Sequence, residues 1–276
     1  YIGAIGENSA AILAVHPSNY RIEGFTNEVP AEKLAAIAGD HDIELIYDVG
    51  GGVLMDLERF GLPHEPVVGD AVSDGAGLVS FSGDKLLGGP QSGIVVGRAD
   101  LVEKLHTNPL MRALRCDRLT YAALEATLLL YLKDEAEVQI PALNRLIESQ
   151  NIVQKRAETL LELLDYQQPL PTVEESEAQV GSGALPTETL PSAAVVLRVK
   201  DATALQVARR LRLCEPPLFG FVRDDAVWLD MRTVTDSELP LVARAVGWAF
   251  SDPLGDGILG IADEPASGHS SGQGTV

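Results

Sequence analysis

Short apolar runs separated by polar or glycine-rich segments mark the first hundred residues of this chain. Each run has the length of a buried strand, and they cover residues 10–15, 43–47, 77–81 and 94–97. A helix is predicted from Pro30 to Ala38, where proline suits the first turn, and another over residues 100–107. Strands that alternate with helices predict an α/β fold with a mostly parallel sheet.

The remaining chain reads as helices up to about residue 164 and as alternating strands and helices after residue 191. Asp117 or Thr120 suits the cap of a helix that continues to about Lys133, and a further helix is predicted over residues 142–164. Residues 167–191 are rich in Pro, Gly, Ser and Glu, which predicts a loop. Strands and helices alternate after it, at residues 193–199, 202–213, 227–231 and 238–250. This alternation predicts a smaller C-terminal α+β domain.

These patterns divide the chain into parts. We expect one domain over residues 1–118, connecting helices over 119–165, and the small domain over 166–256. Residues 257–276 are rich in Gly and Ser, and we expect them to form a disordered tail. The chain begins at Tyr1 rather than Met, inside what reads as the approach to a strand, so we expect a fragment of a longer protein.

Composition excludes several classes of function. A net charge of −19 disfavours nonspecific nucleic-acid binding by the whole chain, although Arg112, Arg115 and Arg118 allow a local basic patch. Cys116 and Cys214 are too far apart in sequence to suggest a disulfide framework or a metal site, and no histidines stand at ligand spacing. No metal is therefore expected.

The hydropathy pattern bears on localisation. No apolar run approaches the roughly 20 residues that a membrane-spanning helix needs, and no basic-then-apolar leader opens the chain. We expect a cytoplasmic protein that does not enter a membrane.

Lys85 lies in a turn between two predicted strands, after Ser82 and before the glycines Gly88 and Gly89. Lysine forms Schiff bases with carbonyl cofactors when burial frees its amine. A surface lysine in a glycine-rich turn is the alternative interpretation. His16, Asp48 and Lys85 each follow a predicted strand closely, and ligands bind at such strand ends in α/β sheets. This convergence favours a site.

A pyridoxal phosphate enzyme needs a lysine, a carboxylate at the ring nitrogen and donors for the phosphate. Asp48 is placed for the carboxylate, Ser82 offers a hydroxyl, and Gly88 and Gly89 allow backbone N–H groups to approach an anion. Taken alone, Asp48 and Ser82 are also ordinary turn or cap residues. The signatures of a P-loop, a dinucleotide-binding turn and a hydrolase nucleophile elbow are absent from the sequence.

Five segments resemble the bacterial selenocysteine synthases, the L-seryl-tRNA(Sec) selenium transferases, which are fold-type-I pyridoxal phosphate proteins. The segments are HPSNYRIEGFT (16–26), IYDVGGG (46–52), SFSGDKLLGGPQSGIVVG (80–97), LRCDRLTYAALEATLLLYL (114–132) and ALPTETLPSAAV (184–195). The resemblance covers nearly all of residues 1–250, and the SGDKLLGGPQ run is specific for this family and its close relatives. It implies that residues 1–118 are the C-terminal part of a large cofactor-binding domain.

The resemblance also assigns roles to single residues. It implies that Lys85 is the Schiff-base lysine, Asp48 the partner of the ring nitrogen and Asp84 an active-site acid. Arg112 and Arg115 correspond to active-site arginines, whose guanidinium forks suit the oxyanion of selenophosphate. The resemblance further implies a homo-oligomer built from dimers.

One departure from the family lies beside the site. The family commonly reads Asp-Leu-Gly-Ser-Gly where this chain has Asp48-Val-Gly-Gly-Gly52, so a hydroxyl is absent at Gly51.

The reaction implied by the resemblance converts seryl-tRNA(Sec) to selenocysteinyl-tRNA(Sec) with selenophosphate, through a dehydroalanyl intermediate. Two alternatives stay open at this point. One is a related pyridoxal phosphate lyase that acts on a small amino acid or an amino sugar phosphate. The other is a catalytically inert fragment with a binding or assembly role.

Overall fold

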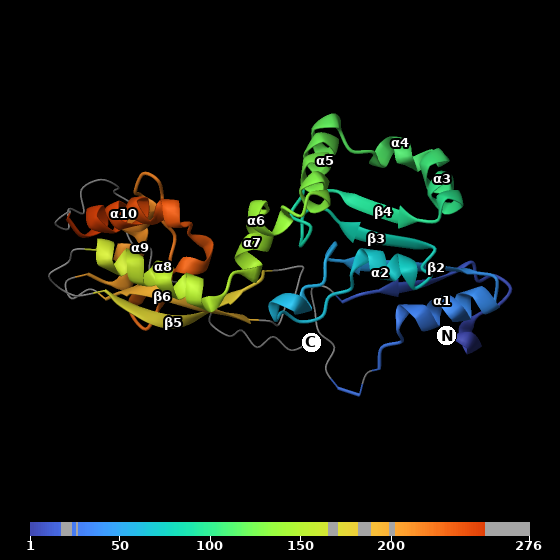
Figure 1. The fold of residues 1–276 in the computed structure, drawn as a ribbon, viewed down its shortest axis with the longest axis horizontal. Helices are drawn as coiled ribbons and strands as arrows, with labels where there is room; N and C mark the ends of the chain where they lie inside the picture. The colour runs from blue at the N-terminus through green and yellow to red at the C-terminus, as the bar shows by residue number, and fades with distance from the viewer. Residues whose placement is uncertain (18–23, 26, 165–170, 182–188, 199–201, 252–276) are drawn as a thin grey trace, which may run out of the picture.

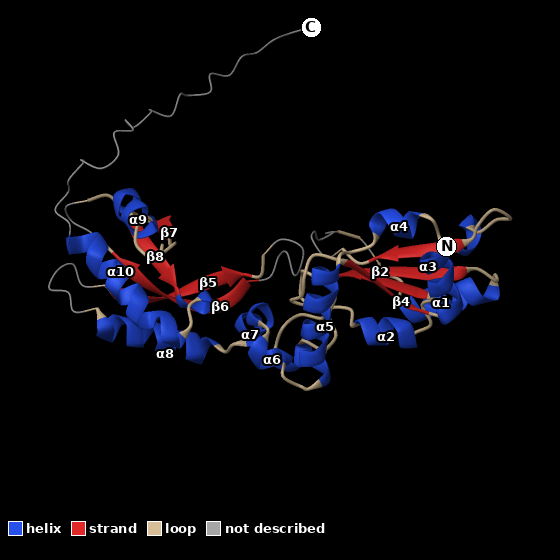
Figure 2. Ribbon diagram, turned by 90° about the horizontal axis from the view of Figure 1, so that it is seen from above, coloured by secondary structure: helices blue, strands red, loops and turns tan. Residues whose placement is uncertain are grey.

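Two four-stranded sheets, each with its own helices, make up the computed structural model (Figure 1). Seen from above, the short helices α6 (Ala136–Gln139) and α7 (Pro141–Ile147) lie between the two sheets (Figure 2). The structure describes residues 1–17, 24–25, 27–164, 171–181, 189–198 and 202–251.

The first sheet confirms the prediction of a mostly parallel sheet. Its strands lie in the order of the sequence, as β1 (Ala11–Val15), β2 (Glu44–Gly50), β3 (Leu78–Ser82) and β4 (Gly93–Gly97). The first three are parallel, and β4 pairs antiparallel with β3. The four apolar runs therefore each form a strand, and the carboxyl ends of β1, β2 and β3 meet at one edge.

Helices connect and cover this sheet. Leu34 and Ala38 of the first helix are buried against the sheet in one apolar cluster with Leu45 and Val79. The helices of this part are α1 (Ala31–Asp40), α2 (Val68–Ser73), α3 (Ala99–Thr107), α4 (Leu110–Leu114) and α5 (Arg118–Leu132), with short 3-10 turns at Ile2–Ala4 and Glu58–Phe60. The predicted cap is confirmed, because the Asp117 carboxylate accepts the N–H of Thr120 at 2.8 Å.

The single helix predicted over residues 142–164 is wrong. Two helices occupy this stretch, α7 and α8 (Gln150–Leu163), with extended backbone at Glu148 and Ser149 between them. The guanidinium of Arg232 donates to the carbonyl oxygens of Arg145 and Glu148, both at 2.9 Å. A distant arginine thus satisfies carbonyls at the helix end, which the local sequence pattern could not reveal.

The second sheet is antiparallel and contains two strands, at residues 172–179 and 221–223, that the sequence pattern did not predict. Its order is β5 (Thr172–Gln179), β6 (Thr189–Leu197), β8 (Ala226–Asp230) and β7 (Phe221–Arg223). The loop predicted over residues 167–191 is therefore wrong where β5 and the start of β6 lie. β5 is rich in Glu and pairs along its whole length with β6, so this neighbour, rather than intrinsic propensity, makes it a strand.

Three helices pack on one face of the second sheet, namely α8, α9 (Ala204–Arg212) and α10 (Leu239–Ser251) (Figure 1). Short 3-10 turns at Met231–Thr233 and Asp236–Glu238 precede α10. Val153, Ala157 and Leu160 of α8 belong to this core. The sequence placed α8 among connecting helices, and we propose instead that the second unit begins with it. The tail expected over residues 257–276 lies outside the described residues.

Candidate functional site

Asp48 lies near the carboxyl end of β2, between the ends of two parallel neighbours. It pairs with Val15 of β1 and with Ser80 of β3. The register of β2 and β3 shifts between Asp48 and Gly50, an irregularity of the kind that re-aims side chains beside active sites. The Asp48 carboxylate accepts the N–H of Gly50 at 3.2 Å, which holds the start of the glycine loop against the side chain.

Lys85 occupies the turn that follows β3 and is half-buried, whereas its neighbour Asp84 is exposed. Ser82, the last residue of β3, is half-buried and pairs with Gly93 of β4. The turn is tied to the loop after Asp48, because the N–H of Leu86 donates to the carbonyl oxygen of Gly51 at 3.0 Å. The lysine turn and the aspartate loop are thus brought together at the carboxyl edge of the sheet.

The predicted phosphate donors Gly88 and Gly89 use their N–H groups within the turn of Lys85. The N–H of Gly88 donates to the carbonyl oxygen of Lys85 at 2.9 Å, and the N–H of Gly89 donates to that of Gly83 at 2.8 Å. Both N–H groups thus close the turn itself, and their role toward a phosphate stays a prediction. Gly88 has φ +74°, a conformation that glycine adopts without strain. The two glycines therefore shape the turn around Lys85.

His16 follows β1 directly, as predicted, and joins the same edge. Its backbone N–H donates to the carbonyl oxygen of Asp48 at 2.8 Å. Its Nε2 lies 3.4 Å from Oε2 of Glu65, a residue that the sequence analysis did not single out. Glu65 lies between Pro63 and Pro66 in the loop before α2, and a charged residue flanked by prolines is only a weak sequence signal.

The Glu65 carboxylate is buried, with 5% of its side chain exposed, and its charge reaches the neighbouring strand. Burial raises the pKa of Tyr47, and the negative charges of Glu28, Glu65 and Asp74 raise it further. Tyr47 directly precedes Asp48. The loop of Glu65 and the end of β2 therefore interact electrostatically.

Arg112 and Arg115 lie apart from this cluster along the chain. Arg112 is part of α4 and Arg115 caps its C-terminus, and both side chains are exposed. The helix lies beyond the edge strand β4, between α3 and α5 (Figure 1). Their role at the site of Lys85 stays a prediction.

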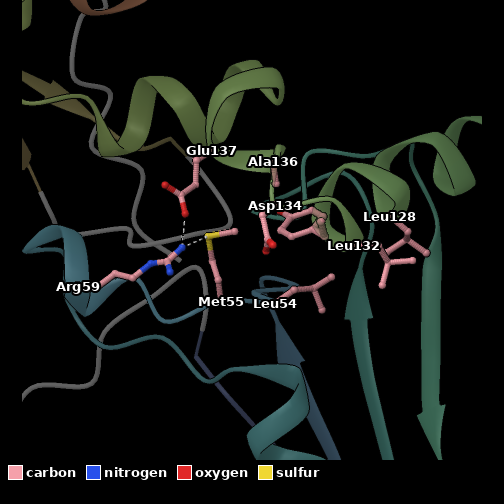
Figure 3. Close-up of a pocket in the computed structure, with 9 residues that line it drawn as sticks. Leu54, Met55, Arg59, Leu128, Leu132, Asp134, Ala136 and Glu137 are labelled. Carbon is pink, nitrogen blue, oxygen red and sulfur yellow. Dashed lines mark hydrogen bonds and ion pairs between the residues drawn. The ribbon is translucent and has the colours of Figure 1, made fainter.

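A cavity of about 500 Å³ lies beside the site but contains none of the predicted residues. Leu54, Leu128 and Leu132 form its apolar wall, and Arg59 reaches across to Glu137 (Figure 3). Tyr131 also lines this cavity and connects it to the lysine turn, because its phenol O–H donates to the carbonyl oxygen of Leu87 at 3.0 Å. Burial raises the pKa of Tyr131 to about 12, so this phenol stays protonated and keeps its donor.

The described residues contain no group of three or more His, Cys, Asp or Glu side chains arranged to hold a metal ion. None of their helices is long and apolar enough to cross a membrane.

Comparison with known proteins shows which family the chain resembles. Residues 1–235 match the family model described as L-seryl-tRNA selenium transferase. The L-seryl-tRNA(Sec) selenium transferase of Alkaliphilus metalliredigens is 44% identical over 250 residues, covering 89% of this chain and 53% of the relative. That of Rhizobium meliloti is 46% identical over 242 residues, covering 86% and 52%. The chain therefore spans about half the length of the curated relatives it matches.

Solved structures confirm the fold class. A D-glucosaminate-6-phosphate ammonia-lyase superimposes with a TM-score of 0.52 at 20% identity, covering 90% of this chain and 59% of that one. At this identity the likeness concerns the fold alone. The chain has the α/β architecture of fold-type-I pyridoxal phosphate enzymes, with a mostly parallel sheet and a second, antiparallel sheet.

Proposed function

The chain belongs to the L-seryl-tRNA selenium transferase family, and from this premise we propose that it is part of an enzyme that converts seryl-tRNA(Sec) to selenocysteinyl-tRNA(Sec). The proposed cofactor is pyridoxal phosphate, and the proposed selenium donor is selenophosphate. The observation that carries the proposal is the hydrogen bond from Leu86 to Gly51, which holds the turn of Lys85 against the loop of Asp48.

The residues at this edge fit the chemistry of the cofactor. The carboxylate of Asp48 lies near the carboxyl end of β2 and the amine of Lys85 follows the adjacent parallel strand β3, and each side chain is half-buried. Lys85 would hold the cofactor through its amine, and Asp48 would face the ring nitrogen. When bound, pyridoxal phosphate supplies an electron sink for negative charge that develops at the α-carbon of an amino acid.

The side chains of this chain would handle the protons of the reaction. The amine at Nζ of Lys85 would take the proton from the α-carbon of the seryl group. The carboxylate of Asp48 would favour the protonated form of the ring nitrogen. The exposed Asp84 is the nearest acid in sequence to Lys85, and we propose it as an accessory proton carrier.

We propose that Arg112 and Arg115 bind the oxyanion of selenophosphate, because paired guanidinium groups match such an anion with charge-assisted hydrogen bonds. Both arginines are exposed on the α4 segment. This placement suits a site that two copies of the protein complete together.

The surface next to these arginines supports such an assembly. Helix α5 contains no fully buried residue although it is rich in leucine. Leu110 and Leu114 of α4 are 67% and 72% exposed, and Leu119 and Leu132 of α5 are 81% and 80% exposed. Large apolar side chains left exposed on neighbouring helices indicate a protein contact. We therefore propose a homo-oligomer in which a second copy covers α4 and α5.

The proposed function is tested with the intact protein, seryl-tRNA(Sec), selenophosphate and pyridoxal phosphate. Formation of selenocysteinyl-tRNA(Sec) is the expected result, measured by acid hydrolysis and selenium detection. Release of ammonia from a small amino acid or amino sugar phosphate, without conversion of the tRNA, would replace this function by that of a related lyase. Absence of pyridoxal phosphate binding would favour a non-catalytic role.

A further inference from the structure

Glu65 presents a buried oxygen that has no hydrogen-bond partner among the described residues. Its Oε2 is one of two buried side-chain polar atoms in the described part of the chain with this property. Removing a carboxylate from water is costly unless the surrounding protein compensates for it. Such an atom therefore needs an explanation in terms of what faces it.

Two neighbours define the surroundings of this oxygen, and both belong to the candidate site. Nε2 of His16 lies 3.4 Å away, and a Cβ atom built on Gly51 would lie 3.6 Å away. The loop of Glu65 is anchored beside them, because the N–H of Val68 donates to the carbonyl oxygen of Val53 at 2.9 Å. The carboxylate thus faces the ends of β1 and β2.

We propose that Glu65 is a positioning residue of the site, whose carboxylate accepts a hydrogen bond from Nε2 of His16 and fixes the orientation of the imidazole. The backbone of His16 is already held by the carbonyl oxygen of Asp48. The contact with Glu65 also restrains the side chain of His16, because Nε2 lies only slightly beyond the usual hydrogen-bond distance from Oε2 of Glu65. Because His16 is predicted to bind the cofactor, we expect Glu65 to affect cofactor binding through His16. This part of the proposal rests on the proposed function.

A second His–Glu pair in the same loop region provides a matched comparison. Nδ1 of His64 lies 3.2 Å from Oε2 of Glu58, but those side chains are 71% and 58% exposed. The corresponding values for His16 and Glu65 are 19% and 5%. An exposed pair contributes little to stability or orientation, because water competes for both side chains. A buried pair restricts the orientation of both side chains.

The first test follows the Nε2–H proton of His16 by NMR of the chain labelled with ¹⁵N-histidine, with the signal assigned by its loss in His16→Gln. In the unsubstituted chain this proton should exchange slowly with solvent. Glu65→Leu removes the acceptor and should speed the exchange about tenfold or more. Glu65→Gln keeps a neutral acceptor and should give an intermediate rate, and it serves as the second variant if Glu65→Leu does not fold. Glu58→Leu should leave the His16 signal unchanged.

The second measurement is the dissociation constant of pyridoxal phosphate, read from its visible absorption. Glu65→Gln should weaken binding about tenfold, and Glu58→Gln should leave it unchanged. An exchange rate at His16 that is the same with and without the Glu65 carboxylate would overturn the proposal. Equal affinities of the unsubstituted chain and Glu65→Gln would overturn the role in cofactor binding. If the unsubstituted protein binds no cofactor, the proposed function fails, and the exchange rates alone decide the pairing.

Discussion

The backbone N–H of Leu86 donates to the carbonyl oxygen of Gly51 at 3.0 Å, across a gap of 35 residues in sequence. This bond joins the turn that carries Lys85 to the loop that follows Asp48. Packing reinforces it, since a Cβ atom at Gly52 would lie 2.5 Å from the carbonyl oxygen of Ser82. The geometry of the candidate site therefore depends on close backbone contact at glycines.

The substitution Gly88→Ala tests how tightly the lysine turn is packed. The new Cβ would overlap Cγ2 of Ile140, and the backbone has φ +74°. Strain and overpacking together should lower the free energy of unfolding by about 2–4 kcal/mol. Urea denaturation measures the change.

The control for this substitution is Gly69→Ala in α2, where a Cβ meets nothing within 4 Å. It should leave stability unchanged or raise it by about 0.5–1 kcal/mol. Equal effects of the two substitutions would show that the turn is not packed as described.

An ion network around the buried Arg156 holds the junction between α7 and α8, and Arg156→Met should disrupt it. Arg156 donates to both oxygens of Glu148 and to Asp236, and its side chain is 3% exposed. Without the arginine, the buried carboxylate of Glu148 loses two hydrogen bonds and a neutralising charge. The free energy of unfolding should therefore fall by about 3–5 kcal/mol. The fall is measured by chemical denaturation.

Arg198→Met is the matched exposed variant, because Arg198 pairs with Glu174 on the surface. It should cost less than about 1 kcal/mol. A similar small cost for Arg156→Met would contradict a stabilising role of the buried network.

Sequence patterns predicted the first sheet well because each of its strands coincides with a short apolar run. The carboxyl-edge positions of His16, Asp48 and Lys85 follow from those strands. The break at Glu148 and the strand β5 could not be predicted in the same way. Arg232 stabilises the break from more than eighty residues away, and β6 provides the partner that makes β5 a strand.

What the sequence could not predict at the site also depends on contacts between distant residues. Gly88 and Gly89 looked suited to an anion, but their N–H groups close the turn through contacts that spacing does not reveal. Glu65 was missed because its relation to His16 exists only after β1 and the loop before α2 come together.

Tyr131→Phe tests the hydrogen bond to Leu87 and its dependence on pH. At neutral pH the loss of the bond should cost about 1 kcal/mol. The folded chain holds the phenol proton up to a pKa of about 12, above the ordinary value of 10.0. The unfolded chain loses it earlier, so this stabilisation is present below pH 10 and is lost as the pH rises toward 12. Thermal unfolding from pH 8 to pH 12 should show a shallower decline for Tyr131→Phe, and parallel curves would contradict the burial of the phenol.

Gly51→Ser should supply a donor to the Glu65 carboxylate. A Cβ at this position would lie 3.6 Å from Oε2 of Glu65 and 3.3 Å from Cδ1 of Leu86, the end of a flexible side chain. The new hydroxyl should raise the free energy of unfolding by about 1 kcal/mol relative to Gly51→Ala. If serine is no more stable than alanine in thermal unfolding, the hydroxyl does not reach the carboxylate.

The assignment of Lys85 is tested most directly by borohydride reduction of the intact protein after incubation with pyridoxal phosphate, followed by peptide mass spectrometry. The expected results are a visible absorption band that reduction abolishes and a phosphopyridoxyl group fixed on Lys85. Lys85→Ala should show neither, while Lys104→Ala, which changes an exposed lysine on α3, should retain both. A label on another lysine, or an unchanged band in Lys85→Ala, would contradict the assignment of Lys85 as the cofactor lysine.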